Sequence, residues 1–388
     1  PTGFRYRIYN NLSYGPDPDE VLEKAPLPKD DSEIATGKAV IAASGKVYDC
    51  SYQFDGNYHK ERGERVFAGT FGAGVPGVLT YSSKNKNFVL QTKDTTTPSA
   101  VENKEGVLFD DTSVTVLNRG KAGSFGDTGE SIPYCRKSGG SYIFGTVSAA
   151  GSSAFAAVGA DIAFDPAKSV YLMSSFGWST PALLVCDDKP SQGNPAFWYF
   201  NKDILNGKKL EITAPEKLAG AFSSVRDHRE SYRMAALSNG KIVLVDMRAY
   251  PHTWYSGIID AQAGKITFSE LEGNPVFVQD TMYDAFTYKP TSNGFICANA
   301  GAKGVIFHTV SIIGSTVSDT LCNVPNVTFA GAYDAQNRPL VTADGKLKGV
   351  TITGTSYSLA ACEAETLAFT RSDLLQNIYP YTWIQGDY

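Results

Sequence analysis

The densest charge in the central part of the chain falls in residues 226–233, which read RDHRESYR and include Arg229 and Arg233. Guanidinium groups form directed hydrogen bonds with anions and polar ligands, so this segment is a candidate for binding an anion or a sugar. Opposite charges this close in sequence also pair with one another, and exposed ion pairs need no function. The residue types alone leave both interpretations open.

Aromatic side chains gather a little further on, in residues 250–255, which read YPHTWY. Sugars bind to flat aromatic faces with a few polar groups beside them, and the same side chains are enriched at protein interfaces. The proline and histidine between these aromatics predict an exposed loop, whereas residues 197–199 (FWY) fall in a predicted strand and are expected in the core. The candidate ligand-binding residues are Arg229, Arg233, Asp246, Arg248, His252, Trp254 and Tyr255.

Patterns for other chemistry are incomplete. Hydrolysis of a glycosidic bond needs two carboxylates that face each other across a cleft, and sequence spacing cannot pair acidic residues from different loops. The four histidines lack metal-ligand spacing, and neither a phosphate-binding nor a dinucleotide fingerprint occurs. We therefore predict no catalytic residue, no metal site and no cofactor. The acidic residues in predicted loops are Asp187, Asp188, Asp227, Glu230, Asp280 and Asp284.

These residues belong to a repeated pattern of short strands. Residues 232–237 and 241–247 are β-prone runs joined by a turn at Ser238-Asn239-Gly240, and residues 255–260 resume the apolar pattern. The turn is favourable because Asn and Gly take positive φ at little cost. Comparable units of three strands, several preceded by a fourth, are predicted at residues 65–90, 141–172, 182–212, 241–271, 294–321 and 338–361.

A unit repeated every 40–60 residues or so predicts a radial arrangement, in which each sheet buries its apolar faces against its neighbours. We expect an all-β fold, a β-propeller of six or seven four-stranded antiparallel blades. Residues 38–54 are a seventh unit or the closing strand, and residues 359–370 are expected to complete that unit. Two packed sandwiches and a β-solenoid are the alternatives. Short helices are expected at residues 20–24 and 215–219.

The composition divides the chain into three regions. Residues 1–35 are acidic and rich in proline, which predicts an extended N-terminal arm, and residues 36–370 form the propeller. Residues 371–388 are a C-terminal tail with three Tyr and one Trp. We expect the arm and the tail to contact other protein subunits, because exposed aromatic surface usually marks a contact.

Bulk properties exclude several classes of protein. The net charge is −5 and no long basic run occurs, which argues against a nucleic-acid partner. No apolar run approaches the ~18–20 residues needed to span a bilayer. Pro1 fits removal of an initiator Met, which favours cytoplasmic synthesis without export. The six cysteines show no Cys-x-x-Cys spacing, so buried free thiols are expected.

One repeat resembles a blade of the sialidase family of six-bladed propellers. The matching segments are residues 232–235 (YRMA), 239–241 (NGK) and 246–248 (DMR). The resemblance implies that Arg233 and Arg248 are two members of an arginine triad that grips a substrate carboxylate. It also implies a Tyr–Glu nucleophile and an Asp general acid. This chain has Ala235 where that motif has proline, and no aspartate in residues 249–254.

These sequence features leave three functions open. The first is a non-enzymatic binding or assembly module of a virion, such as a phage-tail or receptor-recognition protein that contacts a cell-surface glycan or a partner protein. The Gly- and Tyr-rich β composition favours it. The second is a glycoside hydrolase or lyase for acidic sugars, and the third is a secreted lectin. A fold alone does not decide among them. The expected location is a virion or an extracellular-facing surface.

Overall fold

The computed structural model describes residues 34–55, 66–71, 74–82, 87–94, 99–100, 114–116, 123–124, 130–138, 141–148, 151–158, 171–174, 182–186, 197–201, 207–224, 231–273, 275 and 288–372. This part of the chain is all-β, as predicted, with one helix, α2 (Glu216–Ser224). The helix predicted at 215–219 is therefore longer than expected, and the one at 20–24 lies outside the described residues. No helix in the described part is long and apolar enough to cross a membrane.

The strands of the first half of the chain form three sheets and part of a fourth. The first sheet contains β1 (Ile34–Ala43), β2 (Lys46–Asp55) and, from the far end of the chain, β28 (Glu365–Ser372). The second contains β3 (Val66–Phe71), β4 (Val75–Ser82), β5 (Asn87–Thr92) and β6 (Ser99–Ala100). The third contains β7 (Val114–Val116), β8 (Gly123–Ser124), β9 (Glu130–Ser138), β10 (Ser141–Ser148) and β11 (Gly151–Val158).

An eight-stranded sheet follows, made of two antiparallel halves. The first half is β12 (Tyr171–Ser174), β13 (Ala182–Cys186), β14 (Phe197–Asn201) and β15 (Lys208–Thr213). The second is β16 (Tyr232–Ala236), β17 (Ile242–Asp246), β18 (Thr253–Asp260) and β19 (Lys265–Leu271). A short parallel pairing of β15 with β19 joins the halves.

Two antiparallel four-stranded sheets complete the described chain. One is β20 (Tyr288–Pro290), β21 (Gly294–Gly301), β22 (Gly304–Ile313) and β23 (Thr316–Pro325). The other is β24 (Thr328–Tyr333), β25 (Pro339–Ala343), β26 (Lys346–Thr353) and β27 (Ser356–Ala361).

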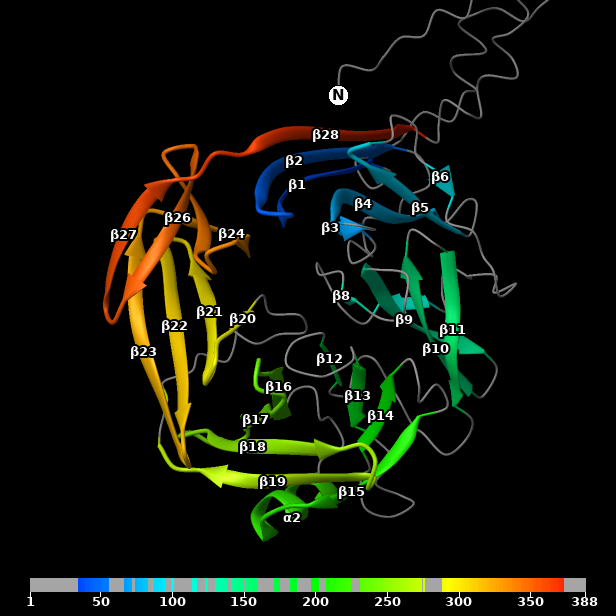
Figure 1. The fold of residues 1–388 in the computed structure, drawn as a ribbon, viewed down its shortest axis with the longest axis vertical. Coiled ribbons are helices and arrows are strands. Elements are labelled where there is room, and N and C mark those ends of the chain that lie inside the picture. Colours follow the sequence, from blue (N-terminus) through cyan, green and yellow to red (C-terminus); the bar gives the residue numbers. More distant parts are fainter. Residues whose placement is uncertain are drawn as a thin grey trace, which may run out of the picture.

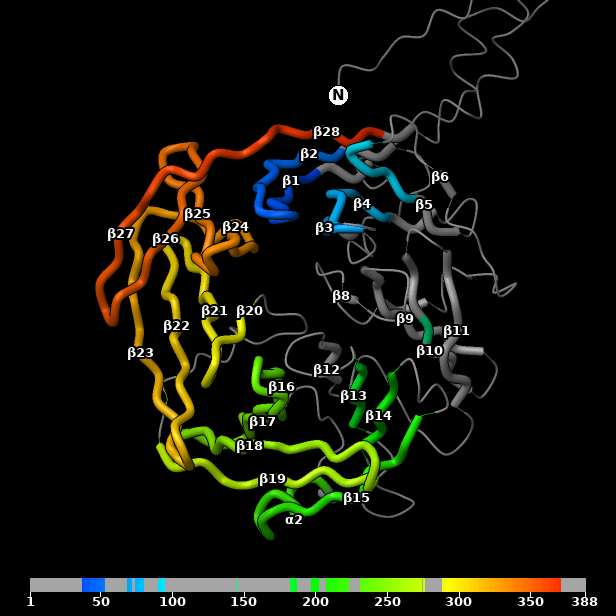
Figure 2. The backbone as a smooth tube through the Cα atoms, viewed as in Figure 1, coloured from blue at the N-terminus to red at the C-terminus, as the bar shows by residue number. Residues whose placement is uncertain are grey.

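The sheets follow one another around a ring (Figure 1). Strands β16, β20 and β24 lie toward the middle of the ring, and β19, β23 and β27 lie on the outside. The two ends of the described chain meet in one sheet, because β28 pairs in parallel with β2 over residues 48–55 and 365–372. Figure 2 shows the two strands running side by side. The predicted meeting of the last strand with the unit near residue 38 is therefore found.

Turn chemistry sets the hairpins where it was predicted. Gly240 takes a φ of 84° between β16 and β17, and Asp344 and Gly345 take φ of 51° and 71° between β25 and β26. These are left-handed conformations, which Gly, Asn and Asp reach most readily. One predicted grouping is wrong: residues 141–172 are not one unit, because β12 pairs with β13 of the next sheet rather than with β11.

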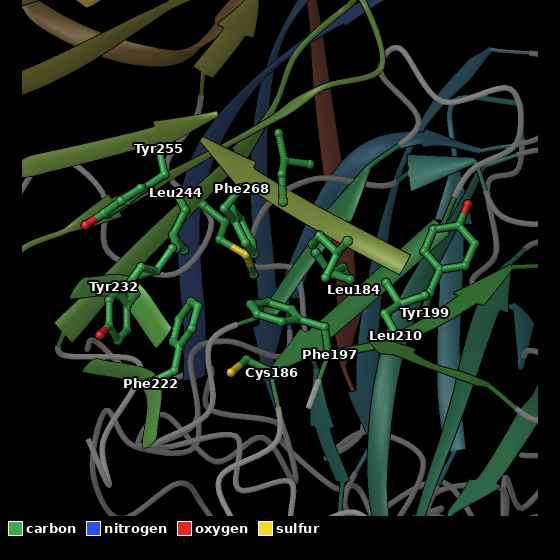
Figure 3. Close-up of a cluster of buried hydrophobic side chains, with 14 of the residues drawn as sticks. Leu184, Cys186, Phe197, Tyr199, Leu210, Phe222, Tyr232, Leu244, Tyr255 and Phe268 are labelled. Carbon is green, nitrogen blue, oxygen red and sulfur yellow. The ribbon is translucent and has the colours of Figure 1, made fainter. Parts of the chain in front are cut away.

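Apolar side chains fill the spaces between successive sheets. Ala182–Cys186 and Ile242–Asp246 are buried at every position because both faces of these central strands are covered. Figure 3 shows the cluster between the halves of the eight-stranded sheet, where Phe222 of α2 lies against Phe197 and Phe268. As predicted, the free cysteines that the structure describes are mostly buried: Cys50, Cys186, Cys297 and Cys322 are buried, and Cys362 is partly buried.

Candidate functional site

The turn between β17 and β18 holds a forked ion pair. The side chain of Asp246 is only 7% exposed, and its Oδ1 accepts hydrogen bonds from Arg248 N (3.1 Å) and Nε (2.9 Å). Its Oδ2 accepts a hydrogen bond from Arg248 Nη2 at 2.6 Å. This bidentate geometry fixes the plane of the guanidinium, and the hydrogen bonds that Arg248 donates to Asp246 raise the pKa of Arg248. Arg248 is therefore permanently charged and preorganised, with a third of its side chain exposed.

Two buried tyrosines, Tyr232 and Tyr255, lie near this ion pair. The guanidinium carbon of Arg248 lies 5.5 Å from the ring centroid of Tyr232, which is the cross-strand partner of Asp246. Burial raises the pKa of Tyr232 well above its usual value and that of Tyr255 to about 12. Both phenols therefore stay neutral at physiological pH. Tyr232 packs against the guanidinium and against Phe222 of α2, at 5.0 Å between ring centroids, and Tyr255 belongs to the same buried cluster.

Helix α2 reaches the same turn. Its first turn follows Pro215, whose carbonyl accepts hydrogen bonds from Leu218 N and Ala219 N, and Glu216 favours the helix N-terminus. Lys217 Nζ donates to Thr253 Oγ1 at 3.0 Å, at the start of β18. Sequence reasoning missed both residues because this contact spans 36 positions, and no local pattern predicts it.

Aromatic rings lie on the exposed side of the turn. Tyr250 is 70% exposed, and its ring centroid lies 5.7 Å from that of His252 in an edge-to-face arrangement. His252 Nδ1 donates to the carbonyl of Ala249 at 2.8 Å, which orients the imidazole and leaves Nε2 on the other side of the ring. The turn therefore presents a flat phenol ring, an oriented imidazole and a fixed guanidinium between Arg248 and His252.

The structure separates the two arginines that the sialidase resemblance would bring together. Side chains alternate across a strand, and Tyr232 packs between the halves of the eight-stranded sheet while Ala235 packs toward β20–β23. Arg233 therefore lies on the face of Ala235, and its Nη1 donates to the carbonyl of Tyr232 at 2.8 Å. Arg248 lies on the face of Tyr232. The two arginines therefore start from opposite faces of one sheet, an arrangement that disfavours a joint grip on one carboxylate.

The other candidates divide between the turn and the core. His252 lies on the exposed turn as predicted, but Trp254 and Tyr255 are 1% and 0% exposed, so the expected exposed loop ends at His252. The reason is that β18 begins at Thr253 and both of its faces are covered there. Phe197 and Tyr199 are buried as predicted. Outside the described residues lie Arg229, the tail beyond Ser372 and the acidic candidates Asp187, Asp188, Asp227, Glu230, Asp280 and Asp284.

Two further polar groups stand out elsewhere in the described chain. His308 Nδ1 and Asp319 Oδ2 lie 2.7 Å apart with side chains 0% and 1% exposed, so they form a buried pair between β22 and β23 that solvent does not reach. Glu365 of β28 bonds Lys46 at 2.7 Å and Lys93 at 2.9 Å on the surface. No cluster of three or more His, Cys, Asp or Glu side chains suited to a metal ion occurs among the described residues.

No protein-family model matches this sequence, and no curated protein sequence matches it. Solved structures with a distant likeness include a functionally unknown protein from Desulfotomaculum acetoxidans, at 9% identity and a TM-score of 0.41, covering 74% of this chain and 78% of that one. The polysaccharide lyase Uly1 matches at 10% identity and a TM-score of 0.42, covering 82% and 84%. Oligopeptidase B from Trypanosoma brucei matches at 12% identity and 0.38, covering 86% and 46%. Such likeness assigns no function.

Proposed function

We propose that this protein is a non-enzymatic binding module with a seven-bladed β-propeller fold, and that it contacts a glycan or a partner protein through the turn between β17 and β18. The blades are β1-β2-β28, β3–β6, β7–β11, β12–β15, β16–β19, β20–β23 and β24–β27. Support for the propeller comes from the antiparallel order of these units, their succession around a ring, and the parallel pairing of β28 with β2.

One observation carries the binding proposal. Arg248 is held in a fixed plane by Asp246, on the same turn as the exposed ring of Tyr250 and the oriented imidazole of His252. Binding costs less when the contact groups are already ordered, and Tyr offers a large, stiff contact surface for a sugar ring or a protein side chain. Arg and Tyr are also the side chains that most often dominate binding energy.

The assembly part of the proposal concerns the sheet in which the chain ends meet. Ile34 pairs with Asp55, and Asp55 pairs with Ser372, so these three residues form one row across the sheet. Adjacent strands are ~4.8 Å apart, which places Ile34 and Ser372 ~10 Å apart. Residues 1–33 and 373–388 therefore both connect to the same end of one sheet. Those two segments carry four basic and nine acidic residues, and so the whole net charge of −5.

We infer from this that the predicted arm (1–35) and tail (371–388), of which residues 34–35 belong to β1 and 371–372 to β28, act together as one contact with other subunits of a virion that recognises a cell surface. The Gly- and Tyr-rich β composition of the chain supports the virion setting, in which the protein is made in the cytoplasm and displayed outside the host cell.

A glycan array and a subunit-assembly assay test the two parts separately. Tyr250→Ala should abolish or weaken binding at least ~10-fold while the folded state persists, and Tyr357→Ala, another partly exposed tyrosine at 39%, is the control. Binding that survives Tyr250→Ala unchanged would refute the site. Deleting either 1–33 or 373–388 should reduce the molar mass measured by light scattering about as much as deleting both. Independent, additive losses would refute the joint contact.

A further inference from the structure

We propose that the turn between β17 and β18 selects an uncharged sugar over an acidic one, an inference that rests on the glycan-binding function proposed above. The sialidase resemblance implies the opposite, a substrate carboxylate held by arginine. We expect this selectivity because the positive charge of Arg248 is already paired with the carboxylate of Asp246.

The positive charge of Arg248 is compensated before any ligand arrives. Asp246 takes the Nε and Nη2 hydrogen bonds of the guanidinium at 2.9 Å and 2.6 Å, and its own carboxylate is buried. An incoming carboxylate would meet a pair with no net charge and would lie close to the carboxylate of Asp246. Like charges within a few ångströms disfavour one another, so the ion pair opposes a second anion.

The pair remains a good hydrogen-bond donor toward a neutral ligand. Nη1 of Arg248 takes no part in the hydrogen bonds to Asp246 and belongs to a side chain that is one-third exposed. Guanidinium donors bind hydroxyl oxygens without needing a ligand charge, and the plane of this guanidinium is already fixed. The exposed ring of Tyr250 and the imidazole of His252 supply an apolar face and a further polar group on the same turn.

Among the described residues, Lys217 is a second basic residue near this turn. Its Nζ donates to Thr253 Oγ1 at 3.0 Å, from an exposed position of α2. A solvated ammonium contributes little to affinity, and salt screens it. The ligand that fits the whole set is therefore a neutral oligosaccharide, recognised by ring stacking and hydrogen bonds to its hydroxyls.

The chain offers a matched control for the decisive ion pair. Asp334 and Arg338 form a pair of the same kind after β24, with an Arg338 Nε to Asp334 Oδ2 distance of 2.7 Å and side chains 5% and 31% exposed. Asp334 Oδ1 also accepts the backbone N–H of Arg338. This pair lies in a different sheet from Asp246 and Arg248, with β20–β23 between them in sequence.

The experiment is titration calorimetry of the full chain with three neutral sugars (lactose, mannobiose and chitotriose) and two acidic ones (sialyllactose and digalacturonate). We expect a neutral sugar to bind at least ~10-fold more tightly than any acidic one, with a Kd that changes less than ~2-fold between low and high salt. Asp246→Asn should raise affinity for acidic sugars and introduce salt dependence, whereas Asp334→Asn should change neither. Thermal unfolding checks that each variant folds.

The possible results distinguish a failure of the selectivity for neutral sugars from a failure of glycan binding at this turn. An acidic sugar bound more tightly by the wild-type protein, with affinity that falls steeply with salt, overturns the selectivity but leaves glycan binding at Tyr250 intact. Binding of none of the five sugars overturns the selectivity together with the glycan part of the proposed function, and leaves contact with a partner protein as the role of this turn. The salt dependence of the wild-type protein decides the question even if Asp246→Asn does not fold.

Discussion

Replacing Phe369 with alanine should release the strand that joins the two ends of the described chain. In β28, Phe369 is 2% exposed and Leu367 is partly buried, while Thr366, Ala368 and Thr370 are exposed. The strand is thus amphipathic, with one apolar face toward Ile41, Tyr48, Cys50 and Val78. Among the described strands, its hydrogen-bonded neighbour is β2, so Phe369 is its main anchor in the core.

The size of the destabilisation follows from the burial of Phe369. Truncating a fully buried Phe to Ala costs ~3–5 kcal/mol, from lost transfer free energy and the cavity left behind. If that cost falls on the docking of β28, the equilibrium constant for local opening should rise by ~10² to 4 × 10³-fold, because each ~1.4 kcal/mol is a factor of ten.

Hydrogen exchange followed by mass spectrometry measures this directly. Amides of residues 365–372 and 48–55 should lose protection, and those of β16–β19 should keep theirs. Leu367→Ala, on the same face but less buried, should have a smaller effect, and Thr366→Ala should have almost none. Unchanged protection in β28, or an equal loss in every sheet, would refute the idea that this strand closes the ring as a separable unit.

Three further predictions concern charge, backbone space and tyrosine ionisation. Hydrogen bonds from Lys46 and then Lys93 lower the pKa of Glu365 to about 2. The ionised carboxylate therefore stabilises the fold above its ordinary pKa of ~4.5, and this stabilisation is lost as pH falls toward 2. Acid should weaken β28 docking in the wild-type protein, and Glu365→Gln should remove this pH dependence in a proteolysis assay. In urea unfolding, Gly273→Ala should lower the free energy of unfolding by at least ~2 kcal/mol more than Gly314→Ala. Both glycines have positive φ, but only at Gly273 would a Cβ overlap the carbonyl oxygen of Val317. Equal losses of stability would contradict this. Burial raises the pKa of Tyr255 to about 12, so the unfolded chain loses this proton first and folding stability should fall as pH rises above ~10. Ultraviolet titration of Tyr255→Phe should lack one late-ionising tyrosine of the wild-type protein. If the missing tyrosine titrates near pH ~10 instead, the buried environment is contradicted.

The strand pattern was predictable because it is local. In the second half of the chain, β-branched runs such as 242–246 and turn residues such as Asn239-Gly240 specify hairpins without help from distant contacts. The error at residues 141–172 has the same origin. A strand such as β12 reads as a strand from its residues, but the sheet it joins depends on pairing with β13, which the local pattern does not encode.

The candidate site was only half predictable. Asp246 and Arg248 are two residues apart, so their pairing is a local matter, and Tyr250 and His252 lie on the turn that follows. Burial of Trp254 and Tyr255 was not visible in the sequence, because an aromatic residue looks the same in an exposed loop and in a covered strand. The contact of Lys217 with Thr253 depends on where α2 packs.

The amino-acid sequence by itself determined the all-β class, the hairpins and the buried thiols, since alternation, turn residues and composition act over a few residues. Only the tertiary structure decided that Trp254 and Tyr255 are buried, and that β28 returns to β2. Both depend on which sheets pack together and in what register. That outcome is set by the burial of many side chains at once, each contributing a little, and no short segment carries it.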